Sequence, residues 1–183
     1  MYENITLDSI AHMGIYEEFV KMYKEGEQYK KDITGDTLLW TALCNTNNEE
    51  KYKIANFLIN KGADVKFINK EGLSLFFPLF SHGRDDIVKT TILCKTLLEK
   101  GADITPLYKP HKTVMFKNIF NYDNVPEIEM MPLYELIFAQ PGLKLLVKDK
   151  WGLTLLDFAK KAERYIGVKY IEDYIRKYNL TNE

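Results

Sequence analysis

The chain has 183 residues, and its 25 basic and 26 acidic side chains leave a formal net charge of −1. This length suits one domain or one short array of repeats, and a hydrophobic fraction of 46% favours a folded chain. The near-zero charge argues against a general nucleic-acid binder, because such proteins present a strongly basic surface.

The first residues predict a protein of the cytoplasm. Four acidic side chains lie among the first eighteen residues, where a secretory signal needs a basic stretch followed by an apolar one. The longest uncharged apolar stretch, residues 72–83, is far shorter than the roughly 20 residues of a membrane-spanning helix, so we expect no membrane association. Neither of the two cysteines belongs to a paired motif, and free thiols are typical of a reducing compartment.

A turn followed by a short apolar helix recurs three times, over residues 34–43, 71–80 and 151–160. In each copy a glycine permits a tight turn, and a Thr or Ser two residues later can cap the following helix. The large side chains inside these copies are predicted to be core residues; they are Trp40, Phe76, Phe77 and Phe80.

A helix end also recurs. Gly62-Ala63-Asp64-Val65 and Gly101-Ala102-Asp103-Ile104 each follow an amphipathic run that ends in lysine. Glycine adopts the left-handed conformation just past a helix end, and lysine there complements the helix dipole. We therefore predict a helix over residues 85–100, with Asp85 and Asp86 complementing the dipole at its beginning.

Together these residues resemble the ankyrin repeat, in which a turn, an inner helix and an outer helix are followed by Gly-Ala-Asp. The resemblance implies an all-α ankyrin-repeat solenoid that forms a single domain over residues 1–183. The approximate repeats are 1–32, 33–67, 68–105, a degenerate 106–148 and a C-terminal 149–183. Leu38, Leu75 and Leu155 replace the family's proline, so the array is expected to be less regular than a consensus one.

The segment 106–148 matches the repeat least. Residues 131–138 are predicted to form an inner helix, with Pro132 at its start, and residues 113–120 another. The last helix is expected to pack through a stripe of residues spaced three or four apart: Val168, Ile171, Ile175 and Tyr178. A similar stripe is predicted for the first outer helix: Ile15, Phe19, Met22 and Tyr23.

Motifs of catalysis are missing from the sequence. It contains no phosphate-binding glycine loop, no nucleophile elbow and no His-Glu-x-x-His motif. The three histidines lack the spacing of metal ligands, so we expect no metal, no cofactor and no catalytic residue. Cys94 with His82 could form a nucleophile and base, but Cys94 lies among apolar residues of a predicted helix, which favours a packed thiol.

The resemblance indicates which residues are exposed for contact with a partner. Trp151 and Lys150 lie at a turn tip, and tryptophan is frequent among the residues that dominate interface energies. The equivalent turn positions are Ile33, Thr34, Asp36, Lys70, Glu71 and Leu73, while Ser81 and His82 would line the concave side.

Solenoids favour binding, because their concave surface can vary without disturbing the core. The sequence is rich in Lys, Asn and Ile, which suggests an AT-rich, bacterial genome. A short stand-alone array of this kind resembles the immunity proteins of bacterial polymorphic toxins, monomeric when free and bound to a cognate protein. The alternatives are an assembly scaffold, an effector adaptor aimed at a host protein, and an enzyme with a pocket in 106–148 that uses His111 or Tyr134.

Overall fold

The structure, a computed structural model, describes residues 5–81 and 85–181. Over these residues the chain is mostly helical, as the sequence predicts. The α-helices are α1 (Leu7–Met13), α2 (Tyr16–Met22), α3 (Leu38–Leu43), α4 (Asn48–Asn60), α5 (Phe76–Leu79), α6 (Ile87–Glu99), α7 (Met131–Phe138), α8 (Leu155–Lys161) and α9 (Tyr165–Lys177). Short 3₁₀ helices are η1 (Glu27–Tyr29), η2 (Lys117–Asn121) and η3 (Glu127–Met130). An antiparallel pair of strands, β1 (Leu107–Tyr108) and β2 (Thr113–Val114), pairs Leu107 with Val114.

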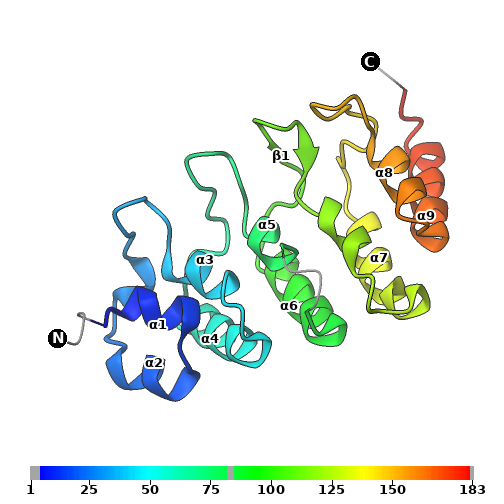
Figure 1. Cartoon of the computed structure of the whole chain (residues 1–183). Helices are drawn as coiled ribbons and strands as arrows, with labels where there is room; N and C mark the ends of the chain where they lie inside the picture. Colours follow the sequence, from blue (N-terminus) through cyan, green and yellow to red (C-terminus); the bar gives the residue numbers. More distant parts are fainter. Residues whose placement is uncertain (1–4, 82–84, 182–183) are drawn as a thin grey trace.

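The helices stand in two rows (Figure 1). The inner row contains α1, α3, α5, η2 and α8, and the outer row contains α2, α4, α6, α7 and α9. Consecutive helices of the outer row contact one another along its length, as α1, α3 and α5 do in the inner row. Within the described residues, five helical hairpins therefore follow one another along one direction.

Four loops project from the same side of this row (Figure 1). We call them fingers: finger 1 is residues 30–37, finger 2 is 63–74, finger 3 is 102–114 and finger 4 is 143–154. Each finger leads into an inner-row helix. Finger 3 contains the two strands, so the expected helix over residues 113–120 is wrong: β2 begins at Thr113 and only the short η2 follows.

The helix α7 lies in the outer row, where it contacts α6 and α9, so its prediction as an inner helix is also wrong. Its bounds and its early Pro132 are as predicted. The glycine that follows α7 explains why this helix was assigned to the wrong row. Gly142 has φ +79°, close to the +82° of Gly62 and the +89° of Gly101, and so repeats the helix end of the outer row. It is followed by Leu143 and Lys144 instead of Ala-Asp, which hid the match.

The helix α5 is shorter than its counterparts. Thr37 and Thr154 cap α3 and α8 with their side chains, as predicted, whereas Ser74 does not cap α5. Pro78 has no amide hydrogen to donate to the Ser74 carbonyl, so the helical bonding starts late. Of the predicted core aromatics, Trp40, Phe76 and Phe80 are buried, whereas Phe77 is half-buried.

The helix α6 begins at Ile87, two residues later than predicted. Asp86 is its N-cap, and its carboxylate accepts the amide of Lys89 at 3.0 Å. Asp85 points inward instead and pairs with Lys51 of α4 at 2.7 Å, with both side chains fully buried. This carboxylate therefore serves a contact between two hairpins and not the helix dipole.

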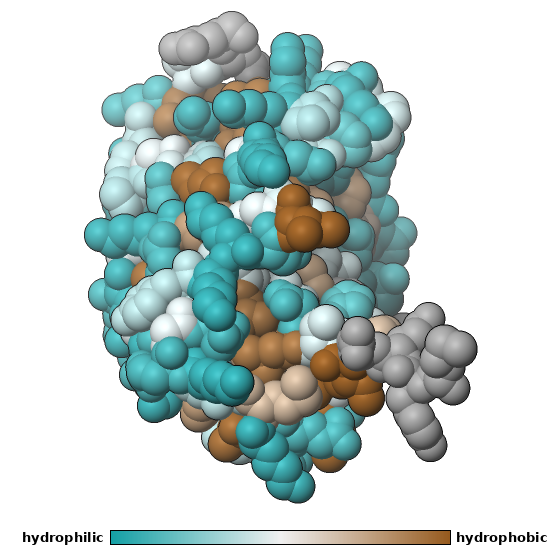
Figure 2. Space-filling view, turned by 90° about the vertical axis from the view of Figure 1, so that its left-hand side faces the viewer, coloured by the Kyte–Doolittle hydropathy of each residue, from teal (hydrophilic) through white to brown (hydrophobic). Residues whose placement is uncertain are grey.

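The apolar stripes predicted for the helices at the two ends of the row are only partly buried. In α9, Ile171 is buried and Val168 and Ile175 are half-buried, but Tyr178 is exposed. Around α2, Phe19 is buried, whereas Ile15 and Met22 are 44% and 41% exposed. Figure 2, which faces this N-terminal end, shows apolar residues in separate patches between polar ones. The end of the row is thus only partly covered by polar side chains.

Candidate functional site

Fingers 1, 2 and 4 share one turn, built on a side-chain carbonyl or carboxylate oxygen. With Oδ1, Asp32, Asn69 and Asp149 each accept the backbone amides of the residues two and four positions further on, at 2.8–3.0 Å, and Asp32 also accepts that of Gly35. The glycine three positions on has a positive φ in each finger, from +81° to +93°. These local hydrogen bonds satisfy the polar groups of the turn itself. The residues at its tip are therefore free to point outward.

Neighbouring fingers contact one another through lysine stems. A Cβ atom on Gly35 would lie 2.9 Å from Cε of Lys70, and one on Gly72 would lie 3.3 Å from Cε of Lys109. Each lysine of the next finger thus covers the turn glycine of the previous one. The aliphatic part of lysine packs well on such a surface while its ammonium group stays in water.

Fingers 3 and 4 carry a row of aromatic rings. Phe77 of α5 lies 5.5 Å from Tyr108, Tyr108 lies 4.7 Å from His111, and His111 lies 5.5 Å from Trp151, all measured between ring centroids. Trp151 remains 62% exposed. The row connects three consecutive hairpins and ends in a large accessible ring, the kind of side chain that anchors interfaces.

Two lysines flank this row. The ammonium of Lys150 donates to Nε2 of His111 at 2.9 Å and lies 4.3 Å from the Trp151 ring centroid. Lys117 of η2 lies 5.4 Å from the same ring and 4.3 Å from that of Phe158. Such cation–π contacts fix the orientation of an exposed tryptophan.

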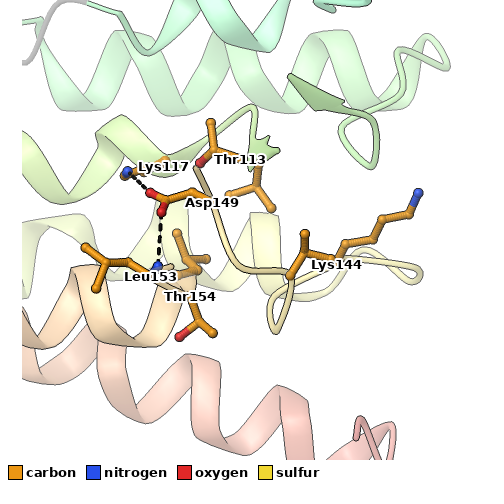
Figure 3. A pocket seen from close by; sticks show the side chains of 9 residues that line it. Thr113, Lys117, Lys144, Asp149, Leu153 and Thr154 are labelled. Atoms are coloured by element: carbon orange, nitrogen blue, oxygen red, sulfur yellow. Dashed lines mark hydrogen bonds and ion pairs between the residues drawn. The ribbon is translucent and has the colours of Figure 1, made fainter. Parts of the chain in front are cut away.

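Asp149 connects the turn of finger 4 to Lys117. Its Oδ1 accepts the turn amides, and its Oδ2 pairs with Lys117 at 3.0 Å (Figure 3). Burial would raise the pKa of this carboxyl, but the amide bond from Leu153 and the pair with Lys117 outweigh it and lower the pKa below its usual value. The carboxylate therefore stays charged and neutralises Lys117.

A small cavity lies beside this ion pair, in the segment for which the enzyme hypothesis required a pocket (Figure 3). Its volume is about 10 Å³, roughly the room that one water molecule needs. This cavity is too small for an organic substrate, but a larger groove is also lined by residues of this segment. A wider, open groove lies on another side of finger 4 and runs to the C-terminal residues; its lining includes Lys112, Lys144, Leu146, Val147, Lys148 and Leu180.

The predicted contact residues are only partly brought together. Lys150 and Trp151 lie together at the tip of finger 4. Ile33, which is fully exposed, and Thr34 lie at the tip of finger 1, and Lys70 and Glu71 lie at that of finger 2.

Three other predicted contacts have different environments. Leu73 is a correction: it is only 4% exposed and belongs to the core, because the chain turns inward after Gly72. Asp36 is half-buried and accepts the Thr34 hydroxyl at 3.1 Å. Ser81 is exposed after α5. His82 lies outside the described residues.

Of the groups weighed for catalysis, those that the structure describes lie in the core or in the aromatic row. Tyr134 is buried among the rings of Phe120, Phe138 and Tyr170, far along the chain from the exposed finger that carries His111. Burial raises the pKa of Cys94, which is packed as predicted, and raises that of the half-buried Cys44 to about 11. Over residues 5–81 and 85–181, no three His, Cys, Asp or Glu side chains are placed to hold a metal ion.

The sequence argument missed Tyr108 and Lys117, and it placed His111 only in the enzyme alternative. Its best available signal was the spacing of glycines in the outer row: Gly142 follows Gly101 at nearly the distance at which Gly101 follows Gly62. That spacing places residues 106–114 at a finger, and hence places their aromatic residues beside Trp151.

Over the described residues the chain is thus a row of helical hairpins from which four fingers project. In the part of the chain that the structure describes, no helix has both the length and the apolar character to cross a bilayer. No protein-family model matches the chain, and no curated protein matches it.

A solved structure does match. It is the crystal structure of a functionally unknown protein from Leptotrichia buccalis C-1013-b, with 55% sequence identity, a TM-score of 0.88 and coverage of 96% of each chain. At this identity and coverage, the chain belongs to the same family as the Leptotrichia protein.

Proposed function

We propose that this protein is an ankyrin-type binding module without catalytic activity, which neutralises a cognate bacterial toxin by binding it through its fingers. The observation that carries the proposal is the aromatic row that ends in the exposed Trp151, held in place by Lys150 and Lys117. An exposed, oriented tryptophan on a rigid surface loses little conformational entropy when a partner covers it.

The arrangement of the hairpins supports the ankyrin part of the proposal. Turn, inner helix, outer helix and left-handed glycine follow one another in the order of that repeat. The fingers vary in side chains while fingers 1, 2 and 4 keep one turn. Variation at the tips over a repeated framework is typical of solenoids that bind proteins.

The proposal is tested by co-expression with the product of the adjacent gene. We expect a stable complex on size-exclusion chromatography and relief of growth inhibition. Trp151→Ala should weaken the complex about thirtyfold or more, as for a central anchor residue. Tyr165→Ala is the matched control, because Tyr165 is an exposed aromatic residue of the outer row, 69% exposed. Absence of a complex together with unrelieved toxicity would reject the immunity function.

A further inference from the structure

The charge on the fingers is unevenly distributed. Fingers 1 and 2 together carry four lysines and four acidic residues. Fingers 3 and 4 carry five lysines and two aspartates; the lysines are Lys109, Lys112, Lys144, Lys148 and Lys150, all exposed. The excess of positive charge thus lies on the same two fingers as the aromatic row.

Neither acidic group of fingers 3 and 4 forms an ion pair with these lysines. Asp149 is buried and pairs with Lys117, which lies outside the fingers. Asp103 accepts the amide and hydroxyl of Thr105. Among the described residues, no ion pair involves any of the five finger lysines.

Lys150 shows the uncompensated charge most clearly. One of its three donor hydrogens is directed to a ring nitrogen of His111, which, unlike a carboxylate, brings no negative charge to offset the ammonium. The other two donors are available to a carboxylate. Charge-assisted hydrogen bonds of this kind are about twice as strong as neutral ones.

Apolar surface accompanies the lysines. Trp151 is exposed beside Lys150, and the open groove between finger 4 and the C-terminal residues is lined by lysines and by apolar side chains, among them Leu146, Val147 and Leu180. A ligand of this surface therefore gains from carboxylates and from apolar side chains together.

We propose that fingers 3 and 4 bind an acidic segment of the partner protein in which carboxylates alternate with apolar side chains. This inference rests on the proposed function and specifies the partner's contact surface. The carboxylates bond to Lys150 and the neighbouring lysines, and an apolar side chain covers Trp151. The contacted surface is then not the phosphate-binding cleft of a nuclease, because such a cleft is basic and would be repelled.

A nucleic acid fits this surface less well than an acidic protein segment. A polyanion long enough to run along all the fingers would meet the exposed Asp64 and Glu71 of finger 2. The two arginines among the described residues are absent from the fingers: Arg164 is buried and Arg176 lies on α9. Arginine is the residue that most often recognises phosphate bidentately.

The test is selection of a random dodecapeptide display library on the full-length protein. We expect the enriched peptides to be more acidic than the starting library and to contain apolar residues between the acids. Their affinity should fall about tenfold or more on Lys150→Glu, while Lys95→Glu on α6 should leave it unchanged. Peptides no more acidic than the library, or equal binding by both variants, would overturn the inference.

Two further outcomes separate this inference from the proposed function. If the adjacent gene product forms a complex that Lys112→Glu and Lys150→Glu do not weaken, the toxin-binding function stands and the acidic-segment inference is wrong. If oligothymidine binds the fingers more tightly than the selected peptides, the ligand is a nucleic acid and the inference is again wrong. If acidic peptides are enriched but the gene product does not bind, only the immunity function fails.

Discussion

The first three hairpins and the last two reach the same arrangement with different polar interactions. In the first part, Lys51 and Asp85 form a fully buried ion pair that connects α4 to the segment before α6. In the last part, Arg164 donates to the carbonyls of Phe120, Tyr122 and Val125 and so supports an irregular stretch without a full inner helix. The fold tolerates this irregular stretch because one guanidinium satisfies the carbonyls that a helix would otherwise satisfy.

The fingers of these two parts of the molecule also differ from each other. Fingers 1 and 2 are balanced in charge, and their contacts are lysine stems on turn glycines. Fingers 3 and 4 are basic and are linked by aromatic rings in edge-on and tilted contact. The backbone conformation is therefore repeated along the row of hairpins, whereas the side chains of the fingers differ where a partner is expected to bind.

Removal of the buried lysine should have the largest effect on stability. Lys51→Met leaves Asp85 buried without its lysine, so we expect a loss of about 4 kcal/mol in the free energy of unfolding, measured with urea. Lys53→Met, in the same helix but 44% exposed and paired with Glu50, should cost less than about 1 kcal/mol. Equal losses for the two variants would contradict the role of the buried pair.

The arginine of the last part should be nearly as important. Arg164→Ala leaves three carbonyls without their donor, and we expect a loss of about 3 kcal/mol. Hydrogen exchange should quicken in residues 116–130 and stay unchanged in α3 and α4. Arg176→Ala, on the exposed side of α9, serves as the control. Uniform quickening over the whole chain would show that Arg164 is not a local support.

Two glycines of the last part differ in the space around them. A Cβ on Gly167 would lie 2.5 Å from Cε1 of Phe120, so Gly167→Ala should cost about 2 kcal/mol by overpacking, although alanine favours helices. Gly152 has no heavy atom within 4 Å of the added Cβ, so its replacement by alanine should cost only about 1 kcal/mol, for its positive φ. Thermal unfolding measures both, and a stabilised Gly167→Ala protein would disprove the close contact.

The smallest expected effect concerns pH. The pKa of Asp149 is lowered in the folded chain. The carboxylate therefore contributes fully to the free energy of unfolding at a pH well above the usual pKa of 3.8. This contribution is lost as the pH falls through the lowered pKa. Asp149→Asn should therefore destabilise by about 1 kcal/mol at pH 6 and by less at pH 3. Urea titrations at both values check this, and a difference that grows on acidification would have the wrong sign.

The sequence predicts the regular part of this fold well, because its signals are local. The glycines after α4 and α6, the caps Thr37 and Thr154, and the turn tips at Ile33 and Trp151 are found where their residue types require them. These features depend on the backbone conformation of a few neighbouring residues, which the local sequence alone can specify.

The remainder depends on contacts between distant residues. The side chain of Asp85 could have capped α6, but Lys51, 34 positions earlier, draws it into the core. Residues 131–138 have the pattern of an inner helix, and only their packing on α6 and α9 assigns them to the outer row. The same reason explains why only part of the site was predicted. The turn position of Trp151 can be recognised in the sequence, whereas Tyr108 and His111 of the same aromatic row belong to a different finger.

The central claim is that the last two fingers, and not the first two, bind the partner. It is tested by the affinity of the adjacent gene product, measured calorimetrically, for two matched charge-reversal proteins. Lys112→Glu/Lys148→Glu/Lys150→Glu should lower the affinity about a hundredfold or more, whereas Lys30→Glu/Lys31→Glu/Lys70→Glu should change it less than about threefold. Equal losses, or a larger loss for the second protein, would contradict the account.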